Sequence, residues 1–133
     1  MNKPKLDHIG IAVEDIEMAA QAYKTLGFEV GSVEDVPGFG VKVAFLPMES
    51  GSVELVQPVT GDSAIAKYLE KKGQGIHHLC FEVKDIRAEL TRLEAAGVQL
   101  VDKVPRQGAH GTLVAFLHPK STGGVLIELA QKG

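Results

Sequence analysis

The chain has little of what marks a secreted, membrane-spanning or nucleic-acid-binding protein. It contains one cysteine, Cys80, so it cannot form an internal disulfide, and this is consistent with a reducing cytosol. No apolar run approaches the roughly 18 residues of a membrane span, and the first residues lack the apolar core of a signal peptide. A net charge of −3 gives no basic excess for nucleic acid or an anionic membrane. We therefore expect a soluble, cytoplasmic protein with neither of those partners.

What the chain does contain is an internal repeat. Residues 6–30 align without a gap with residues 76–100, and the match resumes more loosely further along each half. Each half has a histidine near its start and a glutamate near its end. The matched pairs are His8 with His78 and Glu54 with Glu128.

Hydrophobic periodicity predicts the same order of elements in both halves. Residues 5–13 alternate and are rich in Ile and Val, which predicts a strand. Asp15 is a predicted N-cap for a helix that Gly27 ends. The apolar positions of this helix recur at helical spacing: Ile16, Ala19, Ala20, Tyr23 and Leu26.

Short strands are predicted after each helix, and a further helix is predicted between the halves. The remaining predicted elements are strands at about 28–34, 41–47 and 52–58, a connecting helix over 62–73, a strand over 76–83, a helix over 85–96, and strands near 98–104, 112–118 and 124–131. The sequence thus predicts one α+β domain of two tandem βαβββ modules, about 5–58 and 76–131. We expect the modules to form a cupped mixed sheet around a metal-binding cleft.

The alternation of side chains along a strand places the matched residues on one face. His8 shares its face with Gly10 and Ala12, while the large apolar side chains of the same strand point the other way. In the second copy, His78 shares its face with Cys80 and Glu82. Each half is therefore expected to cover its apolar face with its helix, and to present histidine and glutamate among small residues on the other.

Two imidazoles and two carboxylates suit a divalent ion such as Zn, Co, Ni, Fe or Mn. An open site of this kind polarises a bound carbonyl and stabilises an enolate beside it. The alternative is that the histidines are half-buried strand residues with hydrogen-bonded partners and that the glutamates face water. Agreement between the two halves favours the metal site.

Other candidate residues carry weaker signals. Alternation places His77 on the face opposite His78, and His110 falls in a loop, where a surface histidine is the simpler interpretation. Cys80 lacks an evident general base, which favours a small buried thiol. Gln57 and Gln131 match in the repeat but lie three residues past the glutamates, so they are expected to point away from them.

Four segments, in the order DHIGIAV, VELVQP, HHLCFEV and HPKSTGGVLIEL, resemble the vicinal oxygen chelate superfamily over essentially the full chain. Within it the chain is most similar to the methylmalonyl-CoA epimerases, chiefly through GIHHLCFEVKDI, GVKVAFLP and the HPKSTGGVLIEL ending. The resemblance implies paired βαβββ modules and a divalent ion, Co, Mn, Zn, Ni or Fe. The implied metal ligands are His8, Glu54, His78 and Glu128.

The implied reaction is epimerisation of methylmalonyl-CoA, by proton abstraction and return at C2 through a metal-stabilised enolate. Inversion needs two bases or one mobile base, serving the two faces of the enolate. Glu128 is one candidate catalytic base. Some epimerases carry another glutamate on the third strand, where this chain has Val43, so the second base stays open among Glu54, Glu49 and a metal-bound water.

The resemblance implies an acyl-CoA substrate, and local basic charge and loop position give the candidate residues for contacting it. The candidates are Lys120 and Arg106 for the CoA phosphates and His118 for substrate contact, with Lys71-Lys72 as a further basic pair. Relatives commonly form homodimers, so a homodimer is expected.

Two alternatives to the epimerase function remain: a glyoxalase-type lyase or isomerase acting on a thiol hemithioacetal, and a metal-free binding module. A dioxygenase would use two histidines and one glutamate, and the presence of Glu54 argues against it.

Overall fold

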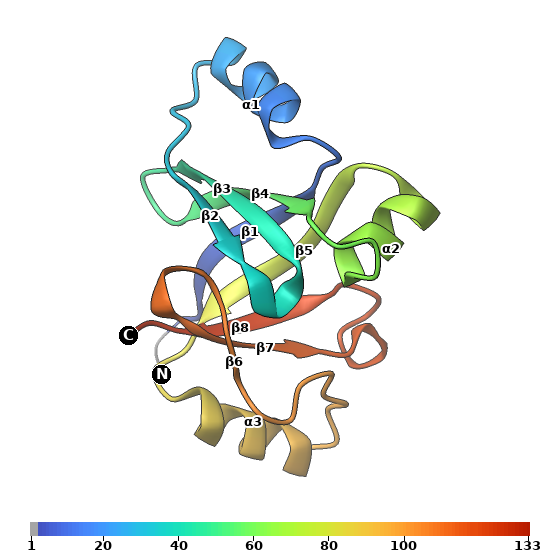
Figure 1. The fold of residues 1–133 in the computed structure, drawn as a ribbon. Helices are drawn as coiled ribbons and strands as arrows, with labels where there is room; N and C mark the ends of the chain where they lie inside the picture. Colours follow the sequence, from blue (N-terminus) through green and yellow to red (C-terminus); the bar gives the residue numbers. More distant parts are fainter. Residues whose placement is uncertain (1–2) are drawn as a thin grey trace. The chain divides into compact units, whose positions relative to one another are not determined.

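The structure, a computed structural model, describes residues 3–133. The chain divides into two compact units, one made of His8–His77 and the other of His78–Gly133 together with residues 3–7. The first half contains β1 (Lys5–Ala12), α1 (Ile16–Thr25), β2 (Val33–Val36), the 3-10 turn η1 (Pro37–Phe39), β3 (Val41–Pro47), β4 (Ser52–Pro58) and then α2 (Ala64–Lys72) (Figure 1). The second contains β5 (Gly75–Glu82), α3 (Ile86–Ala95), β6 (Arg106–Gln107), η2 (Ala109–Gly111), β7 (Leu113–Leu117), η3 (Pro119–Ser121) and β8 (Ile127–Gln131). The predicted α+β class and the βαβββ order are confirmed.

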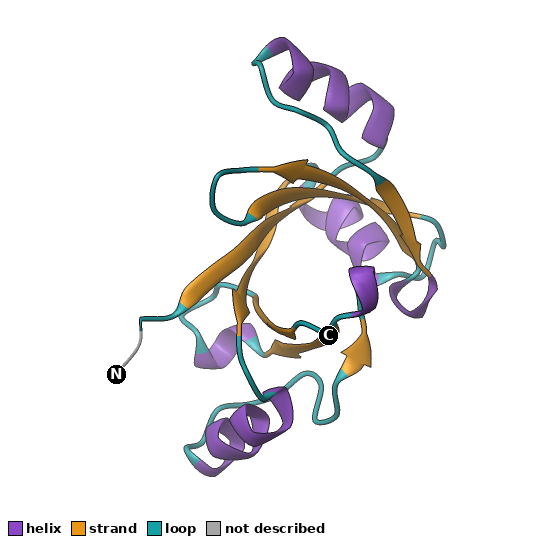
Figure 2. Ribbon diagram, turned by 90° about the vertical axis from the view of Figure 1, so that its left-hand side faces the viewer, coloured by secondary structure: helices purple, strands orange, loops and turns teal. Residues whose placement is uncertain are grey.

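The strands of both halves pair in the same way. The strand order is β2-β3-β4-β1 in the first half and β5-β8-β7-β6 in the second. The first strand of each half runs parallel to its last strand, β1 with β4 and β5 with β8, and the other pairs are antiparallel. A parallel pair needs a crossover connection, which α1 and α3 provide, and each helix lies beside the strands of its own half (Figure 2).

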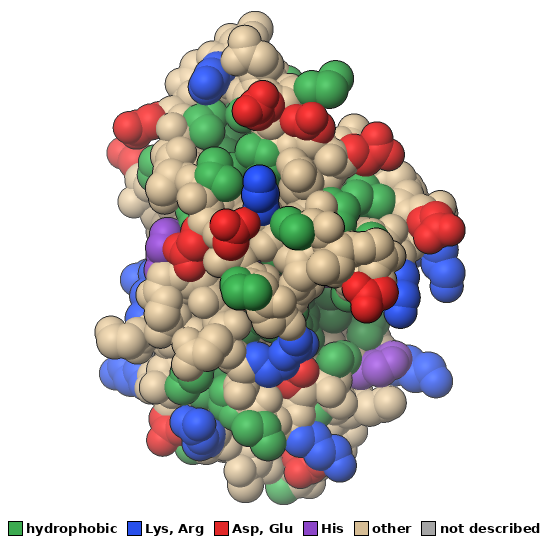
Figure 3. All heavy atoms as spheres, in the orientation of Figure 1, with side chains coloured by type: hydrophobic (Ala, Val, Ile, Leu, Met, Phe, Trp, Pro, Cys, Tyr) green, Lys and Arg blue, Asp and Glu red, His purple; other side chains and the backbone are tan. Residues whose placement is uncertain are grey.

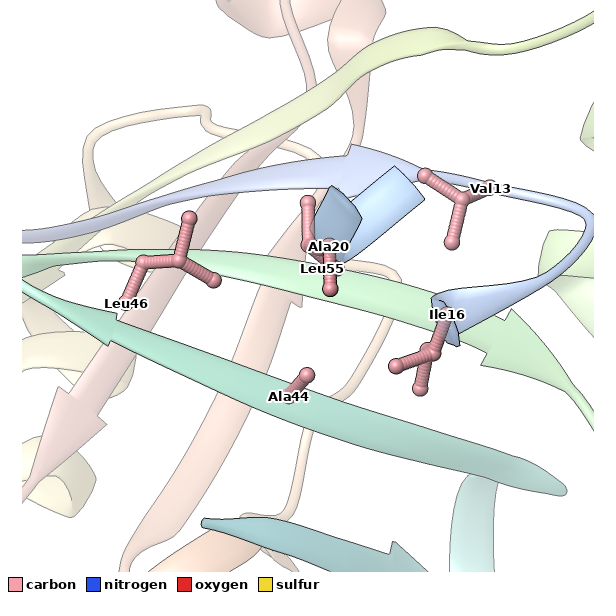
Figure 4. Close-up of a cluster of buried hydrophobic side chains, with 6 residues drawn as sticks. All are labelled: Val13, Ile16, Ala20, Ala44, Leu46 and Leu55. Carbon is pink, nitrogen blue, oxygen red and sulfur yellow. The ribbon is translucent and has the colours of Figure 1, made fainter. Parts of the chain in front are cut away.

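Each helix covers the apolar face of its own strands. In the first half, six buried side chains meet between α1 and the strands: Val13, Ile16, Ala20, Ala44, Leu46 and Leu55 (Figure 4). The equivalent cluster in the second half consists of Ile86, Leu90, Ala115, Leu117 and Leu129. Because side chains alternate along a strand, this packing leaves the opposite face of each sheet for His and Glu.

The start of each main helix is held by two side chains at positions matched in the repeat. Asp15 Oδ1 accepts a hydrogen bond from the Met18 backbone N–H at 3.1 Å, which confirms the predicted N-cap. Gln57 Oε1 accepts one from the Ile16 backbone N–H at 2.9 Å. The matching bonds of the second half join Asp85 to Ala88 and Gln131 to Ile86. The glutamines point away from the matched glutamates, as predicted, and they tie each helix to its last strand.

Replacing Gln57 with alanine is expected to lower the free energy of unfolding by about 1–2 kcal/mol, because the partly buried Ile16 N–H loses its acceptor. Urea unfolding followed by circular dichroism would measure this. Gln107 is exposed on β6, and its replacement by alanine is a control that should stay within about 0.5 kcal/mol of the parent. Equal effects of the two substitutions would contradict the capping role.

Three local predictions were wrong. The strand expected over 28–34 is Val33–Val36, and the one expected over 98–104 is reduced to a bridge at Leu100 before the two-residue β6. Residues such as Val30 and Leu100 pack against the helix clusters without forming a ladder, so their apolar pattern reports burial and not strand pairing. Leu26, placed on the apolar side of the first helix, is the C-cap and is 72% exposed.

Two surface properties bear on the expected partners. Within residues 3–133, no helix is long and apolar enough to cross a membrane. Acidic and basic side chains both occur on the face drawn in Figure 3, among scattered hydrophobic ones.

Candidate active site

The first histidine–glutamate pair lies on β1 and β4. The parallel register places Gly10 beside Glu54, so His8, two residues before Gly10, shares the face of that glutamate. His8 Nδ1 lies 3.1 Å from Glu54 Oε2, and their side chains are only 7% and 12% exposed. The structure therefore brings together the two residues that the repeat singled out in this half.

The second pair repeats this arrangement on β5 and β8. The register places Cys80 beside Glu128, and His78 lies two residues before Cys80. His78 Nε2 is 3.1 Å from Glu128 Oε1, with side-chain exposures of 7% and 9%. Both halves thus hold a buried imidazole against a carboxylate that is at most 12% exposed, so neither glutamate faces open water.

The donor set and its spacing fit a divalent ion. Imidazole nitrogen and carboxylate oxygen are ligands for Zn and for the other divalent transition metals. Two ligands about 2.1 Å from an ion and at right angles around it lie about 3 Å apart, which matches the 3.1 Å separation in each pair.

An aromatic residue that the sequence analysis did not single out packs against the second pair. The Phe116 ring meets the His78 ring edge to face, with centroids 5.4 Å apart, and β7 places Phe116 beside Glu128. In the first half Phe45 lies beside Glu54 in the same register. In the sequence Ala44-Phe45-Leu46 matches Ala115-Phe116-Leu117, and this duplicated phenylalanine was the available signal. Such rings restrict the imidazole and keep water away from it.

The basic residues predicted to bind substrate lie at the surface of the second half. Arg106, on β6, lies opposite Val114, and its Nη1 is 3.8 Å from Asp102 Oδ1. Lys120 is exposed in η3, where its backbone N–H donates to His118 Nδ1 at 3.1 Å. Because Nδ1 of His118 accepts this bond, only Nε2 of that ring remains to contact a ligand. All three roles stay predictions.

The other histidines and the cysteine lie as the strand pattern predicted. The His77 ring contacts Tyr68 edge to face, with centroids 4.8 Å apart, whereas His78 is the histidine beside Glu128. His77, Tyr68, Lys71 and Lys72 help to line a groove of about 530 Å³ along α2. His110 is exposed, with a positive φ of 56°, and Cys80 is fully buried.

The acidic residue of β5, Glu82, forms ion pairs with lysines. Glu82 shares the face of His78, and its Oε1 lies 3.6 Å from Lys5 Nζ and 3.9 Å from Lys132 Nζ. Lys132 also lies 3.0 Å from Asp7 Oδ1. The hydrogen bond and the charge of Asp7, with a smaller contribution from Glu82, raise the pKa of Lys132 above its ordinary value. This lysine therefore stays charged and holds the two carboxylates.

The sequence and fold were compared with known proteins. Residues 7–116 match the Glyoxalase/Bleomycin resistance protein/Dioxygenase superfamily. The chain is 47% identical over 130 residues to an ethylmalonyl-CoA/methylmalonyl-CoA epimerase of Cereibacter sphaeroides, covering 96% of this chain and 97% of that protein. It is 42% identical over 132 residues to the human mitochondrial methylmalonyl-CoA epimerase, covering 98% of this chain and 75% of that protein.

Solved structures agree with the sequence relatives. A methylmalonyl-CoA epimerase in complex with methylmalonyl-CoA and NH4+ superposes with a TM-score of 0.94 at 35% identity, covering 99% of this chain and 96% of that one. The epimerase of Mycobacterium tuberculosis gives 0.91 at 39% identity, covering 97% and 88%. The chain therefore belongs to the Glyoxalase/Bleomycin resistance protein/Dioxygenase superfamily and, within it, to the methylmalonyl-CoA epimerase family of isomerases.

Proposed function

We propose that this enzyme interconverts the 2R and 2S forms of methylmalonyl-CoA by moving the proton on C2. We further propose that it does so with one divalent ion held by His8, Glu54, His78 and Glu128. Membership of the epimerase family supports the reaction. The observation that carries the metal proposal is the pair of equivalent His–Glu contacts, each 3.1 Å long and made by side chains that are at most 12% exposed.

The repeat explains why four ligands would serve one ion. Each half supplies one neutral and one anionic donor, which is half of a four-ligand set. If both halves bind the same ion, two carboxylates balance its double charge and further positions stay open for substrate oxygens. Two separate ions would each have only two protein ligands, fewer than the three or four usual for tight sites.

The residues of the chain carry the proton chemistry. A bound divalent ion supplies Lewis-acid polarisation of substrate oxygens, which lowers the barrier to ionising the neighbouring C–H bond. Glu128, buried beside Phe116 and His78, is the proposed acceptor of the C2 proton. Its burial keeps bulk water from competing for that proton, and contact with His78 orients the carboxylate.

Binding of the rest of an acyl-CoA is assigned to the exposed cations of the second half. Arg106 shares the face of Val114, Ala130 and Glu82 through the strand register, which is the same face as Glu128. A guanidinium in this position suits a carboxylate or phosphate, which it binds in bidentate fashion. Lys120 and His118 lie in and just before the η3 turn that follows β7, and we assign them to the same substrate.

Proton NMR of methylmalonyl-CoA in deuterated buffer tests the proposal. We expect the C2 proton to wash out with the metal-loaded enzyme, to stop doing so after chelation, and to resume on addition of Co or Mn. Absence of exchange with metal-loaded protein would refute the epimerase assignment and direct attention to hemithioacetals. Exchange that survives complete removal of metal would refute the four-ligand site, and ligand binding without turnover would indicate a binding module.

A cytoplasmic homodimer stays a prediction of the sequence. Sedimentation analysis of the purified protein would check the dimeric state, and fractionation of cells would check the cytoplasmic location.

A further inference from the structure

We propose that Glu34, on β2, is the second proton-transfer group of this enzyme and acts on the face of C2 opposite to Glu128. The inference rests on the proposed function. An epimerase removes a proton from one face of a carbon and delivers a proton to the other face, so two groups, or one that moves, must reach that carbon. Glu128 lies in the second half of the chain, and Glu34 lies in the first.

The strand register places Glu34 on the same face as the ligands. Phe45 lies beside Glu54, so the residues of β3 that share its face are Phe45 and, two residues earlier, Val43. Glu34 lies directly opposite Val43 in the antiparallel pair of β2 and β3. The neighbouring acid Asp35 pairs with Lys42 and therefore faces the other side.

The face offers no competing acid in the first half. Among the described strand residues β1–β4, the carboxylates on the ligand face are Glu34 and Glu54. Glu54 is assigned to the ion. Glu49, an earlier candidate, is exposed in the turn between β3 and β4. Glu82, in the second half, is held by Lys5 and Lys132 and lies in the same half as Glu128.

The strand register keeps Glu34 near the proposed ligand Glu54. Side chains directly opposite each other on antiparallel strands have Cβ atoms about 5 Å apart, so the Glu34 side chain can lean over the buried and smaller Val43. Glu34 lies two strands away from β4, across from Val56, and Glu54 lies two residues before Val56 along β4. These two displacements, at right angles to each other, put the Cα atoms of Glu34 and Glu54 about 12 Å apart. Both side chains leave the sheet on the same face, so Glu34 can approach a small acyl group bound beside Glu54.

The repeat gives this position a counterpart. Val114 occupies in β7 the place that Val43 occupies in β3, and the residue opposite Val114 is Arg106. The residue paired with the matched valine is therefore an anion, Glu34, in the first half and a cation, Arg106, in the second. Such an arrangement suits one acidic group for proton transfer and one basic group for anchoring the anionic substrate.

The proton balance of the step is closed. In one direction the Glu128 carboxylate accepts the C2 proton, the electron pair of the broken C–H bond delocalises into the thioester, and protonated Glu34 donates its proton to the opposite face of C2. In the other direction Glu34 accepts and Glu128 donates. Exchange of both carboxyl groups with solvent restores the starting protonation states.

The variant Glu34→Gln tests the inference with each stereoisomer of methylmalonyl-CoA in deuterated buffer. We expect interconversion to fall at least about 100-fold, while one stereoisomer, the one whose proton faces Glu128, still exchanges its C2 proton with retention. Bound metal, measured by mass spectrometry of the purified protein, should equal that of the parent enzyme. Asp35→Asn is the matched control, since it removes the same charge from the adjacent residue on the opposite face, and it should change neither quantity.

Three results would overturn the inference. One is interconversion by Glu34→Gln at the parent rate. Another is equal loss of exchange from both stereoisomers with a folded, metal-loaded protein, and the third is loss of bound metal, which would make Glu34 a ligand or a structural residue. A parent enzyme that exchanges neither stereoisomer would refute the proposed function itself, so the two failures can be told apart.

Discussion

Replacing His78 with glutamine is expected to lower the metal content of the protein and to reduce C2 proton exchange on the order of 100-fold or more. The substitution removes one of four proposed ligands, and loss of residues that merely support a ligand already costs 10–100-fold. It also leaves Glu128 without the imidazole that now lies 3.1 Å away. Metal analysis by mass spectrometry, together with the NMR exchange assay, measures both effects.

His77 provides the control for this experiment. It is the adjacent histidine, but its ring contacts Tyr68 and its side chain leaves the strand on the other face. His77→Gln should therefore keep the metal and most of the exchange rate. If both substitutions reduce metal content equally, the effect comes from disturbing β5 and not from a lost ligand.

Replacing Glu128 with glutamine is expected to slow C2 proton exchange by about 100- to 10,000-fold. Glutamine keeps the shape of the side chain and one potential oxygen ligand, but an amide does not accept a proton at neutral pH. Part of the metal should therefore remain while proton transfer is lost. Exchange rates compared at equal metal loading separate the two contributions.

Glu82→Gln is the matched control for Glu128→Gln. Glu82 lies on the same face of the same half, but Lys5 and Lys132 hold it. The partly exposed ion pairs that would be lost contribute little to stability. Exchange by Glu82→Gln near the parent rate is expected. Exchange by Glu128→Gln at that rate would show that Glu128 is not the base.

The two halves share one local arrangement, which places a histidine beside a glutamate. A parallel pairing of the first and last strands places a histidine diagonally across from a glutamate, and the register is the same in both copies, Gly10 with Glu54 and Cys80 with Glu128. The helix that connects these strands covers the apolar face only. A glutamine just beyond each glutamate fastens that helix, because it accepts from the first helical N–H.

Much of this could be predicted from the amino-acid sequence. The gapless repeat fixed two equivalent units, the two hydrophobic periods distinguished strand from helix, and alternation assigned His8 and His78 to the face opposite the core. These features are local, since each depends on residues that are neighbours along one strand or helix. For the same reason Gln57 could be expected to point away from Glu54.

The tertiary structure decided what depends on pairing between distant segments. A strand exists only where a partner completes its ladder, so residues 28–32 and 98–104 follow a strand-like pattern largely without forming strands. Phe116 contacts His78, and Glu34 lies opposite Val43, because of inter-strand register, which side-chain alternation within one strand does not specify. The sequence by itself determined which residues are duplicated and which way they face. The fold determined their neighbours, because contacts between strands far apart in the chain set which side chains meet.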